Sequence, residues 1–205
     1  MPGGVVFTLI VDSYGQKYKK QVPNYLALVA RFSDLRLIQE GEATPDYDMS
    51  GIDAVVLSGS EKCLTKGECD ETYLEFIRKV GVPLLGVCYG HQVLALAYGQ
   101  EVTKKSKYVR RKFPKQPEKV RIAKCRLLFA GMGSTMLADE SHWESIALVD
   151  RKFELLAYSK SCSVEAIKLK SADKFGVQFH LERSGGYGVA VTGNFYRIVR
   201  RKKRR

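Results

Sequence analysis

No stretch of this 205-residue sequence stays apolar over the roughly 20 residues that a bilayer-spanning helix needs, so we expect no membrane segment. The N-terminal stretch MPGGVVFTLIVD lacks the basic region and the small-residue cleavage site of a signal peptide. Glycine-rich phosphate loops of the GxxxxGK type are missing too, which excludes that kind of ATP site from the chain. These absences favour a cytoplasmic protein that activates no nucleotide itself.

Cysteine pairs with metal-ligand or redox spacing are also missing. The five cysteines form an odd set with no C-x-x-C spacing: Cys63, Cys69, Cys88, Cys125 and Cys162. Neither a disulfide framework nor a zinc site is indicated. We therefore expect a reducing compartment and no bound metal.

Acidic residues are scarce in two segments. Residues 104–126 carry eleven Lys or Arg and one acid, and residues 197–205 carry seven basic residues and no acid. The rest of the chain has sixteen basic and 21 acidic residues, so these two segments produce the net charge of +12. Either segment could bind an acidic partner surface or, as the less favoured partner, a nucleic acid. The alternative is a solvated loop followed by a disordered tail.

Apolar runs with strand and helix character alternate along the first half of the chain. We expect strands at 5–11, 35–38, 53–60 and 82–87, and helices at 24–32, 69–81 and 91–99. In the second half we expect a loop at 104–119, strands at 164–169 and 175–179, and a helix at 189–199. This order predicts an α/β fold with a mainly parallel open sheet flanked by helices. Residues 1–198 are assigned to one domain and residues 199–205 to a basic C-terminal tail.

The segment GVCYGHQ places a cysteine between an expected strand and an expected helix. The pattern Gly86-x-Cys88-x-Gly90 has the form of a nucleophile elbow, in which the glycines allow a sharp turn that holds the side chain out. A helix N-terminus favours a thiolate, and the N–H group of the next residue, Tyr89, can face a developing oxyanion. Cys88 is therefore a candidate nucleophile.

A nucleophilic cysteine needs a base and a group that orients the base. Of the three histidines, His180 ends the strand FGVQF and so lies at a carboxyl edge of the sheet, where ligands bind in such folds. Glu182 follows two residues later, and in an extended segment both side chains point the same way. Cys88, His180 and Glu182 thus form a candidate catalytic triad.

Together, GVCYGHQ and GVQFHLE resemble the class I, triad-type glutamine amidotransferases. The resemblance covers nearly the whole chain: VVLSGS resembles the strand before the family's oxyanion loop, and SHWES resembles a loop over the glutamine site. Within the family, the CYGHQ segment, the SH loop and FELLAYS before VEAIK are most similar to the glutaminase part of GMP synthases.

This resemblance implies that Cys88 hydrolyses L-glutamine to glutamate and ammonia through a thioester. It implies no cofactor in this chain, because ATP and Mg²⁺ belong to a separate ATP-dependent synthetase subunit, which is the expected partner. It also assigns further site residues. They are Gly59 and Tyr89 as oxyanion donors, Gln92 as a substrate contact, and the backbone of Ser141 and His142 as the site for the α-amino acid end of glutamine.

Three positions depart from the family's usual pattern. The oxyanion loop Ser58-Gly59-Ser60 keeps one glycine where the family has two and a proline. Leu181 stands at the proline of the family's HPE motif. Trp143 and Glu144 follow Ser-His, where the family has small and acidic residues.

Two other functions are open at this point. A γ-glutamyl hydrolase-like enzyme would use the same triad without a synthetase partner. A non-catalytic relative would bind a nucleic acid or a regulatory partner through the basic segments. The intact Cys88, His180 and Glu182 argue against the second of these, and the altered oxyanion loop and the net charge argue for it.

Overall fold

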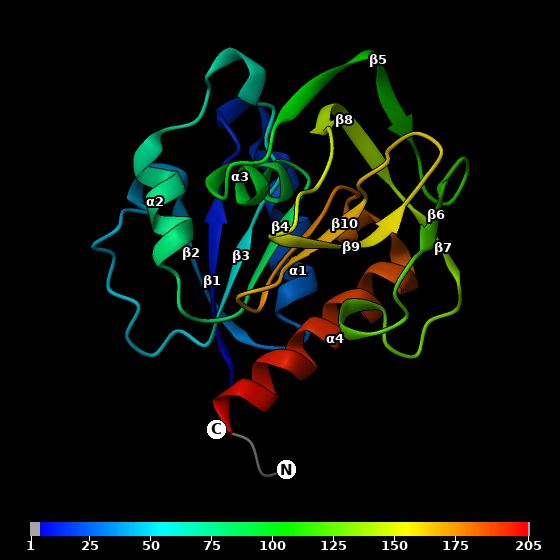
Figure 1. The fold of residues 1–205 in the computed structure, drawn as a ribbon. Helices are drawn as coiled ribbons and strands as arrows, with labels where there is room; N and C mark the ends of the chain where they lie inside the picture. The colour runs from blue at the N-terminus through cyan, green and yellow to red at the C-terminus, as the bar shows by residue number, and fades with distance from the viewer. Residues whose placement is uncertain (1–4, 205) are drawn as a thin grey trace.

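The computed structural model describes residues 5–204, and a nine-stranded sheet is its central element (Figure 1). The strand order is β2-β1-β3-β4-β11-β10-β9-β6-β7. In chain order these strands are β1 (Phe7–Asp12), β2 (Asp34–Gln39), β3 (Ala54–Leu57), β4 (Leu84–Val87), β6 (Glu118–Ile122), β7 (Thr135–Ala138), β9 (Phe153–Tyr158), β10 (Ala166–Leu169) and β11 (Lys174–Val177).

The five strands from β2 to β11 are parallel, and the remaining pairings are antiparallel. The central strands β3 and β4 are buried at every residue, as a sheet covered on both faces requires. In β6 buried and exposed residues alternate, which fits an antiparallel strand with one solvated face. The expected open α/β sheet is confirmed, and the parallel half contains the elbow.

Helices cover both faces of the sheet. Helices α1 (Val22–Val29) and α4 (Gly185–Lys203) pack into one apolar cluster, and α2 (Glu71–Lys79) and α3 (Tyr89–Ala97) pack into another. Short 3-10 helices join the elements: η1 (Gln16–Gln21), η2 (Glu40–Glu42), η3 (Leu64–Lys66), η4 (Leu127–Phe129) and η5 (Leu181–Arg183). Within residues 5–204, none of the helices is long and apolar enough to cross a membrane.

The loop expected at residues 104–119 is wrong, because most of it is a strand. Strand β5 (Val102–Arg111) pairs antiparallel with β8 (Glu140–Ile146) in a separate two-stranded sheet. Most of β5 is solvent-exposed, so its sequence lacks the apolar alternation that identifies a half-buried strand. The two prolines fall in or beside the turn that follows, where Lys112 and Gln116 form a β-bridge.

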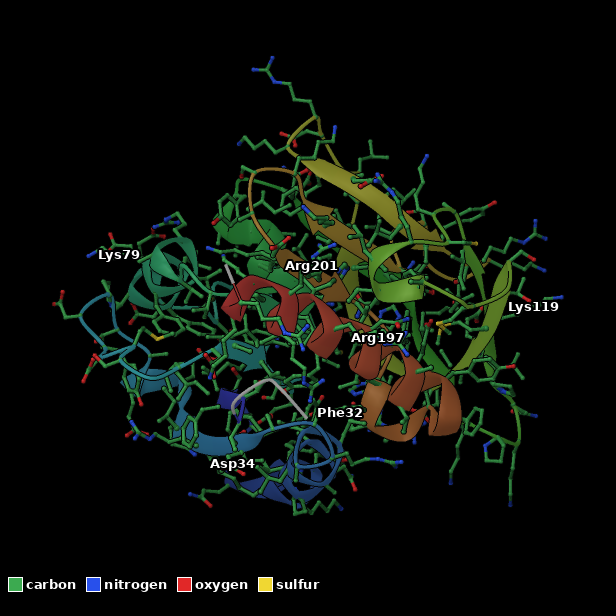
Figure 2. All side chains as sticks on the ribbon, turned by 90° about the horizontal axis from the view of Figure 1, so that it is seen from below. Phe32, Asp34, Lys79, Lys119, Arg197 and Arg201 are labelled. Atoms are coloured by element: carbon green, nitrogen blue, oxygen red, sulfur yellow. The ribbon has the colours of Figure 1, made fainter. Side chains whose placement is uncertain are left out.

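The closing helix is longer than residues 189–199, since α4 continues to Lys203. Residues 199–203 of the expected tail are therefore helical, and Val199 is buried. Lys203 donates to a carboxylate oxygen of Asp53 at 2.6 Å, and Arg200 donates to the carbonyl oxygen of Phe32 at 2.8 Å. Figure 2 shows Arg197 and Arg201 along this helix. The helix ends at the opposite end of the molecule from β5 (Figure 1).

Candidate active site

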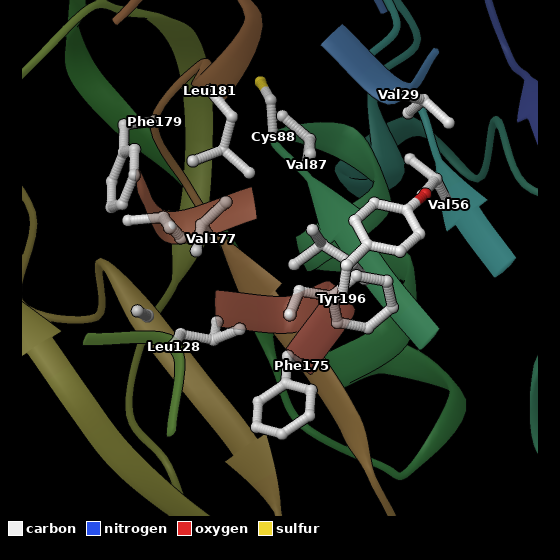
Figure 3. Close-up of a cluster of buried hydrophobic side chains, with 14 of the residues drawn as sticks. Val29, Val56, Val87, Cys88, Leu128, Phe175, Val177, Phe179, Leu181 and Tyr196 are labelled. Atoms are coloured by element: carbon white, nitrogen blue, oxygen red, sulfur yellow. The ribbon is translucent and has the colours of Figure 1, made fainter. Parts of the chain in front are cut away.

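Cys88 occupies the turn between β4 and α3 with an unusual backbone, φ 54° and ψ −103°. Positive φ in a residue other than glycine is a strained conformation that clusters at functional sites. The backbone N–H of Cys88 donates to the carbonyl oxygen of Val177 at 2.8 Å, which fixes the turn to the end of β11. The sulfur points away from the apolar side chains of the neighbouring core (Figure 3).

The two glycines of the elbow are required by close backbone contacts. A Cβ at Gly86 would lie 2.2 Å from the carbonyl oxygen of Gly90, and a Cβ at Gly90 would lie 2.5 Å from that of Leu57. Both distances are far below van der Waals contact, and the obstructing atoms are backbone. The steric reason for reading G-x-C-x-G as an elbow therefore holds in the structure.

His180 and Glu182 lie beyond the carboxyl end of β11, and both side chains are buried. Nδ1 of His180 is 2.7 Å from a carboxylate oxygen of Glu182. Leu181 stands where the family has a proline. Two other contacts hold the backbone in its place: Ser184 Oγ donates to the carbonyl oxygen of His180 at 2.6 Å, and the Leu181 side chain packs into the core. The expected His–Glu pair is present, but the extended segment expected to form it is not, because β11 ends at Val177 and Glu182 lies in the 3-10 helix η5.

The electrostatics of this pair favour a protonated imidazole. Burial opposes a charge on the ring, but the negative charges of Glu182 and of a Cys88 thiolate outweigh it and raise the pKa of His180 to about 10. Burial likewise opposes the charge on Glu182, but the charge of His180 and the hydrogen bond between them lower the pKa of that carboxyl group. Nε2 of His180 is buried with no hydrogen-bond partner among the described residues. That nitrogen remains available for a proton transfer.

The raised pKa of His180 predicts that the free energy of unfolding falls as the pH rises from 6.5 to about 10. Below 6.5 the ring is protonated in both states, and the stabilising interaction is fully present. Above 6.5 the unfolded chain releases the proton, and the stabilisation is lost as the pH approaches the folded-state pKa. Urea unfolding of the wild type and of Glu182→Gln, measured at several pH values, tests this.

The Glu182→Gln protein should lose less stability over that pH range, because its His180 pKa lies closer to 6.5. Other groups that titrate in the range, such as Lys174 with a pKa lowered to about 8 by burial, affect both proteins alike. Equal losses in the two proteins would contradict the prediction.

A cavity of about 440 Å³ opens beside the Cys88 sulfur, within the size range of ligand pockets. Of the candidate residues, those that line it are Cys88, Tyr89, Gln92, Ser141, His142 and His180. Its rim carries an exposed aromatic pair, Tyr108 on β5 and Trp143 on β8, with ring centroids 4.9 Å apart. Most candidate residues therefore gather around one cavity, with Glu182 behind His180, whereas Gly59 is not among the lining residues and its neighbour Ser60 is.

The SHWES segment is strand β8, and it forms one wall of the cavity. The carbonyl oxygen of Ser141 lies 3.9 Å from the Cys88 sulfur. The ring of His142 is turned into the wall, where Nε2 is 3.1 Å from a carboxylate oxygen of Glu140 and Nδ1 is 2.9 Å from the carbonyl oxygen of Glu144. The imidazole ring of His142 is therefore committed to protein partners.

Gln92 lines the cavity, but its amide group is committed to the protein. Nε2 of Gln92 donates to the carbonyl oxygen of Glu144 at 2.7 Å and to Oε1 of Gln178 at 3.1 Å. Gln178 in turn directs its own Nε2 to the Cys88 sulfur at 3.7 Å. The sequence interpretation missed Gln178. A buried amide at the carboxyl end of a strand, two residues before His180, is the signal that could have found it.

The two expected oxyanion donors differ in availability. Tyr89 begins α3, where a backbone N–H has no partner within its own helix. The N–H of Gly59 instead donates to the hydroxyl oxygen of Tyr25 at 3.0 Å. The backbone of Gly59 does not explain why a glycine stands there, because Gly59 is not among the positive-φ glycines of residues 5–204. A Cβ there would meet the Tyr14 hydroxyl at 2.6 Å, so close packing explains this glycine.

His91 is a core residue, as its place behind the elbow suggests. The side chain is fully buried, and Nε2 is 3.2 Å from the carbonyl oxygen of Val164. Burial holds the pKa of His91 down at about 3, so the ring is neutral at physiological pH.

Comparisons with known proteins agree with this geometry. The family model described as glutamine amidotransferase class-I matches residues 9–197. A subunit of the glutamine-hydrolysing GMP synthase of Methanothermobacter thermautotrophicus is 30% identical over an alignment of 202 positions, which covers 94% of this chain and 97% of that protein. The corresponding subunit in Pyrococcus furiosus is 33% identical over 147 residues, covering 70% of this chain and 74% of that protein.

Solved structures share the fold. A Thermoplasma acidophilum protein described as a GMP synthase subunit superimposes with a TM-score of 0.85 at 24% identity, over 98% of this chain and 97% of that one. A glutamine amidotransferase of Thermotoga maritima gives a TM-score of 0.71 at 16% identity, over 98% of this chain and 86% of that one. The chain belongs to the class I glutamine amidotransferase family.

Proposed function

We propose that this chain is the glutamine-hydrolysing subunit of a two-subunit GMP synthase. The observation that carries the proposal is the elbow cysteine beside a buried His–Glu pair in a 440 Å³ cavity, within a chain that aligns over 94% of its length with a subunit of a glutamine-hydrolysing GMP synthase. Membership of the family makes glutamine amidotransfer the activity, and the residue roles and the partner are what we propose.

In the proposed reaction the Cys88 thiolate attacks the side-chain amide carbon of L-glutamine. His180, protonated and paired with Glu182, gives its Nε2 proton to the departing nitrogen, which leaves as ammonia. A water molecule then gives a proton to His180 and attacks the thioester, so glutamate is released and the thiolate is restored. Backbone N–H groups at Tyr89 and Gly59 are the proposed donors to the oxyanion of each tetrahedral intermediate.

Ammonia would be used on another polypeptide. The sequence has no phosphate-binding glycine loop of the GxxxxGK type, so we assign ATP and Mg²⁺ to the partner synthetase subunit. Within residues 5–204, the part of the two basic segments that borders the cavity belongs to β5, through Tyr108 and Arg110, whereas α4 ends at the opposite end of the molecule (Figure 1). We therefore propose that β5, rather than the C-terminal residues, contacts the synthetase.

The test is to measure glutamate and GMP formation by the purified chain alone and with an ATP-dependent GMP synthetase subunit, its nucleotide substrate and Mg-ATP. We expect the chain alone to release glutamate slowly and the synthetase to stimulate it, with GMP formed at the expense of glutamine. The synthetase alone should make GMP only from added ammonia. Glutamate release that the synthetase leaves unchanged would favour a partner-independent γ-glutamyl hydrolase instead.

Charge reversal locates the contact in the same assay. Lys107→Glu on β5 should weaken the stimulation, whereas the matched change Arg201→Glu on α4 should leave it unchanged. The reverse result would assign docking to α4.

A further inference from the structure

The sulfur of Cys88 has two polar neighbours of opposite character. The carbonyl oxygen of Ser141, 3.9 Å away, can only accept a hydrogen bond and therefore suits the thiol form. Nε2 of Gln178, 3.7 Å away, can only donate and therefore suits the thiolate, the form that attacks a carbonyl carbon. Nε2 of His180 has no hydrogen-bond partner within residues 5–204, so Gln178 is the side-chain donor that reaches the sulfur in this structure.

The orientation of the Gln178 amide follows from a chain of hydrogen bonds. The backbone carbonyl oxygen of Glu144 can only accept, so Gln92 must turn its NH₂ group to it, at 2.7 Å. The same NH₂ group donates to Oε1 of Gln178 at 3.1 Å. With its oxygen engaged in this way, Gln178 has its own NH₂ group left to face Cys88. The network therefore fixes a donor, and not an acceptor, beside the sulfur.

Gln178 touches the nucleophile from behind the cavity. It follows β11 directly, its backbone N–H donates to the carbonyl oxygen of Glu165 at 2.8 Å, and its side chain is fully buried. Gln92 lines the cavity, but Gln178 does not. A neutral thiol is a weak acceptor for this buried N–H, whereas a hydrogen bond to a charged acceptor is roughly twice as strong. The contact therefore stabilises the thiolate over the thiol.

On the basis of the proposed function, we infer that Gln178 belongs to the catalytic apparatus, where its side-chain N–H donates to the Cys88 thiolate, and that Gln92 is the positioning residue that holds this amide in place. The role differs from that of His180, which moves protons. Gln178 keeps its proton throughout and acts on the charge of the sulfur before the attack.

The test is Gln178→Met in the full chain, because methionine keeps the length of the side chain and has no N–H donor. Alkylation of Cys88 by iodoacetamide is followed by mass spectrometry over a range of pH. We expect the pH of half-maximal rate to rise by about one unit, since a hydrogen bond to a charged group has about that effect. Below both midpoints the variant should react about tenfold more slowly than the wild type.

The rates at high pH separate an electrostatic role from structural damage. Once Cys88 is fully ionised in both proteins, the variant should react as fast as the wild type or up to about threefold faster, because a less stabilised thiolate is a better nucleophile. A damaged site would be slower at every pH. The other titratable groups coupled to the sulfur are unchanged in the variant: His180, Tyr14 and Tyr25.

Gln100→Met is the matched control. Gln100 is also buried, its Oε1 accepts from the backbone N–H of Asp150 at 2.9 Å, and it does not line the cavity. Its alkylation profile should equal that of the wild type. If Gln178→Met does not fold, Gln92→Met, which frees the Gln178 amide, should shift the midpoint upward by a smaller amount. A folded Gln178→Met or Gln92→Met protein with an unchanged midpoint would overturn the inference.

The two proposals fail in different assays. Alkylation needs neither glutamine nor a synthetase, so it measures the role of Gln178 even if the chain hydrolyses no glutamine, a result that would refute the proposed function. If the wild type is active, Gln178→Met should lower kcat at neutral pH by about tenfold and leave KM unchanged, because Gln178 does not line the cavity. A raised KM with an unchanged kcat would contradict the role of Gln178 alone.

Discussion

Cys88→Ala is expected to lower kcat for glutamine hydrolysis by at least about 10⁴-fold, because it removes the thiol that we propose forms the thioester. The protein should still fold. Alanine carries the same strain as cysteine at this positive φ, and its backbone N–H can still donate to the carbonyl oxygen of Val177. Release of glutamate measures the activity, and circular dichroism with thermal unfolding measures the fold.

Two further cysteine variants make this test specific. Cys125→Ala removes an exposed thiol and should leave kcat unchanged. Cys88→Gly should be as inactive as Cys88→Ala but more stable by about 1 kcal/mol, because glycine relieves the strain of positive φ. A Cys88→Ala protein that keeps even one hundredth of the activity would identify another nucleophile, contrary to the assignment.

His180→Asn is expected to lower kcat by about 10³–10⁴-fold, since it removes Nε2, the atom that we propose moves protons. Asparagine is chosen because its amide N–H can still donate to Glu182 in place of Nδ1. That matters for the fold, because a buried carboxylate left without a partner costs about 3–5 kcal/mol. A normal thermal unfolding midpoint with lost activity would separate catalysis from stability.

His91→Gln is the matched control for His180→Asn. The glutamine amide can replace Nε2 of His91 opposite the carbonyl oxygen of Val164, and His91 does not line the cavity. We expect its kcat to stay near that of the wild type. If the two histidine variants lose activity equally, the loss reports a general disturbance of the core and the role of His180 is not supported.

The elbow and the His–Glu pair could be predicted because their geometry is local. The close approach at Gly86 is to the nearby Gly90, although Gly90 itself also packs against Leu57 on β3. His180 and Glu182, which are 2.7 Å apart, are separated by one residue in the sequence. The parallel half of the sheet was predictable for a similar reason. Strands buried on both faces need continuous apolar runs, and such runs stand out in a sequence.

Strand β5 and the length of α4 could not be predicted in this way. The stability of β5 comes from its pairing with β8, about 40 residues further along the chain, and the exposed strand needs no apolar pattern. The end of α4 packs through Val199 and holds Lys203 against Asp53, so basic residues that resemble a disordered tail remain helical.

The sequence by itself identified the candidate nucleophile, its candidate histidine and the carboxylate beside it, because each is indicated by its immediate neighbours. Only the tertiary structure decided the state of the oxyanion loop and the surroundings of the sulfur. Tyr25 reaches Gly59 from 34 residues away, and Gln178 reaches Cys88 from 90 residues away. Hydrogen bonds between such distant residues depend on how helices pack on the sheet, and no local pattern encodes that packing.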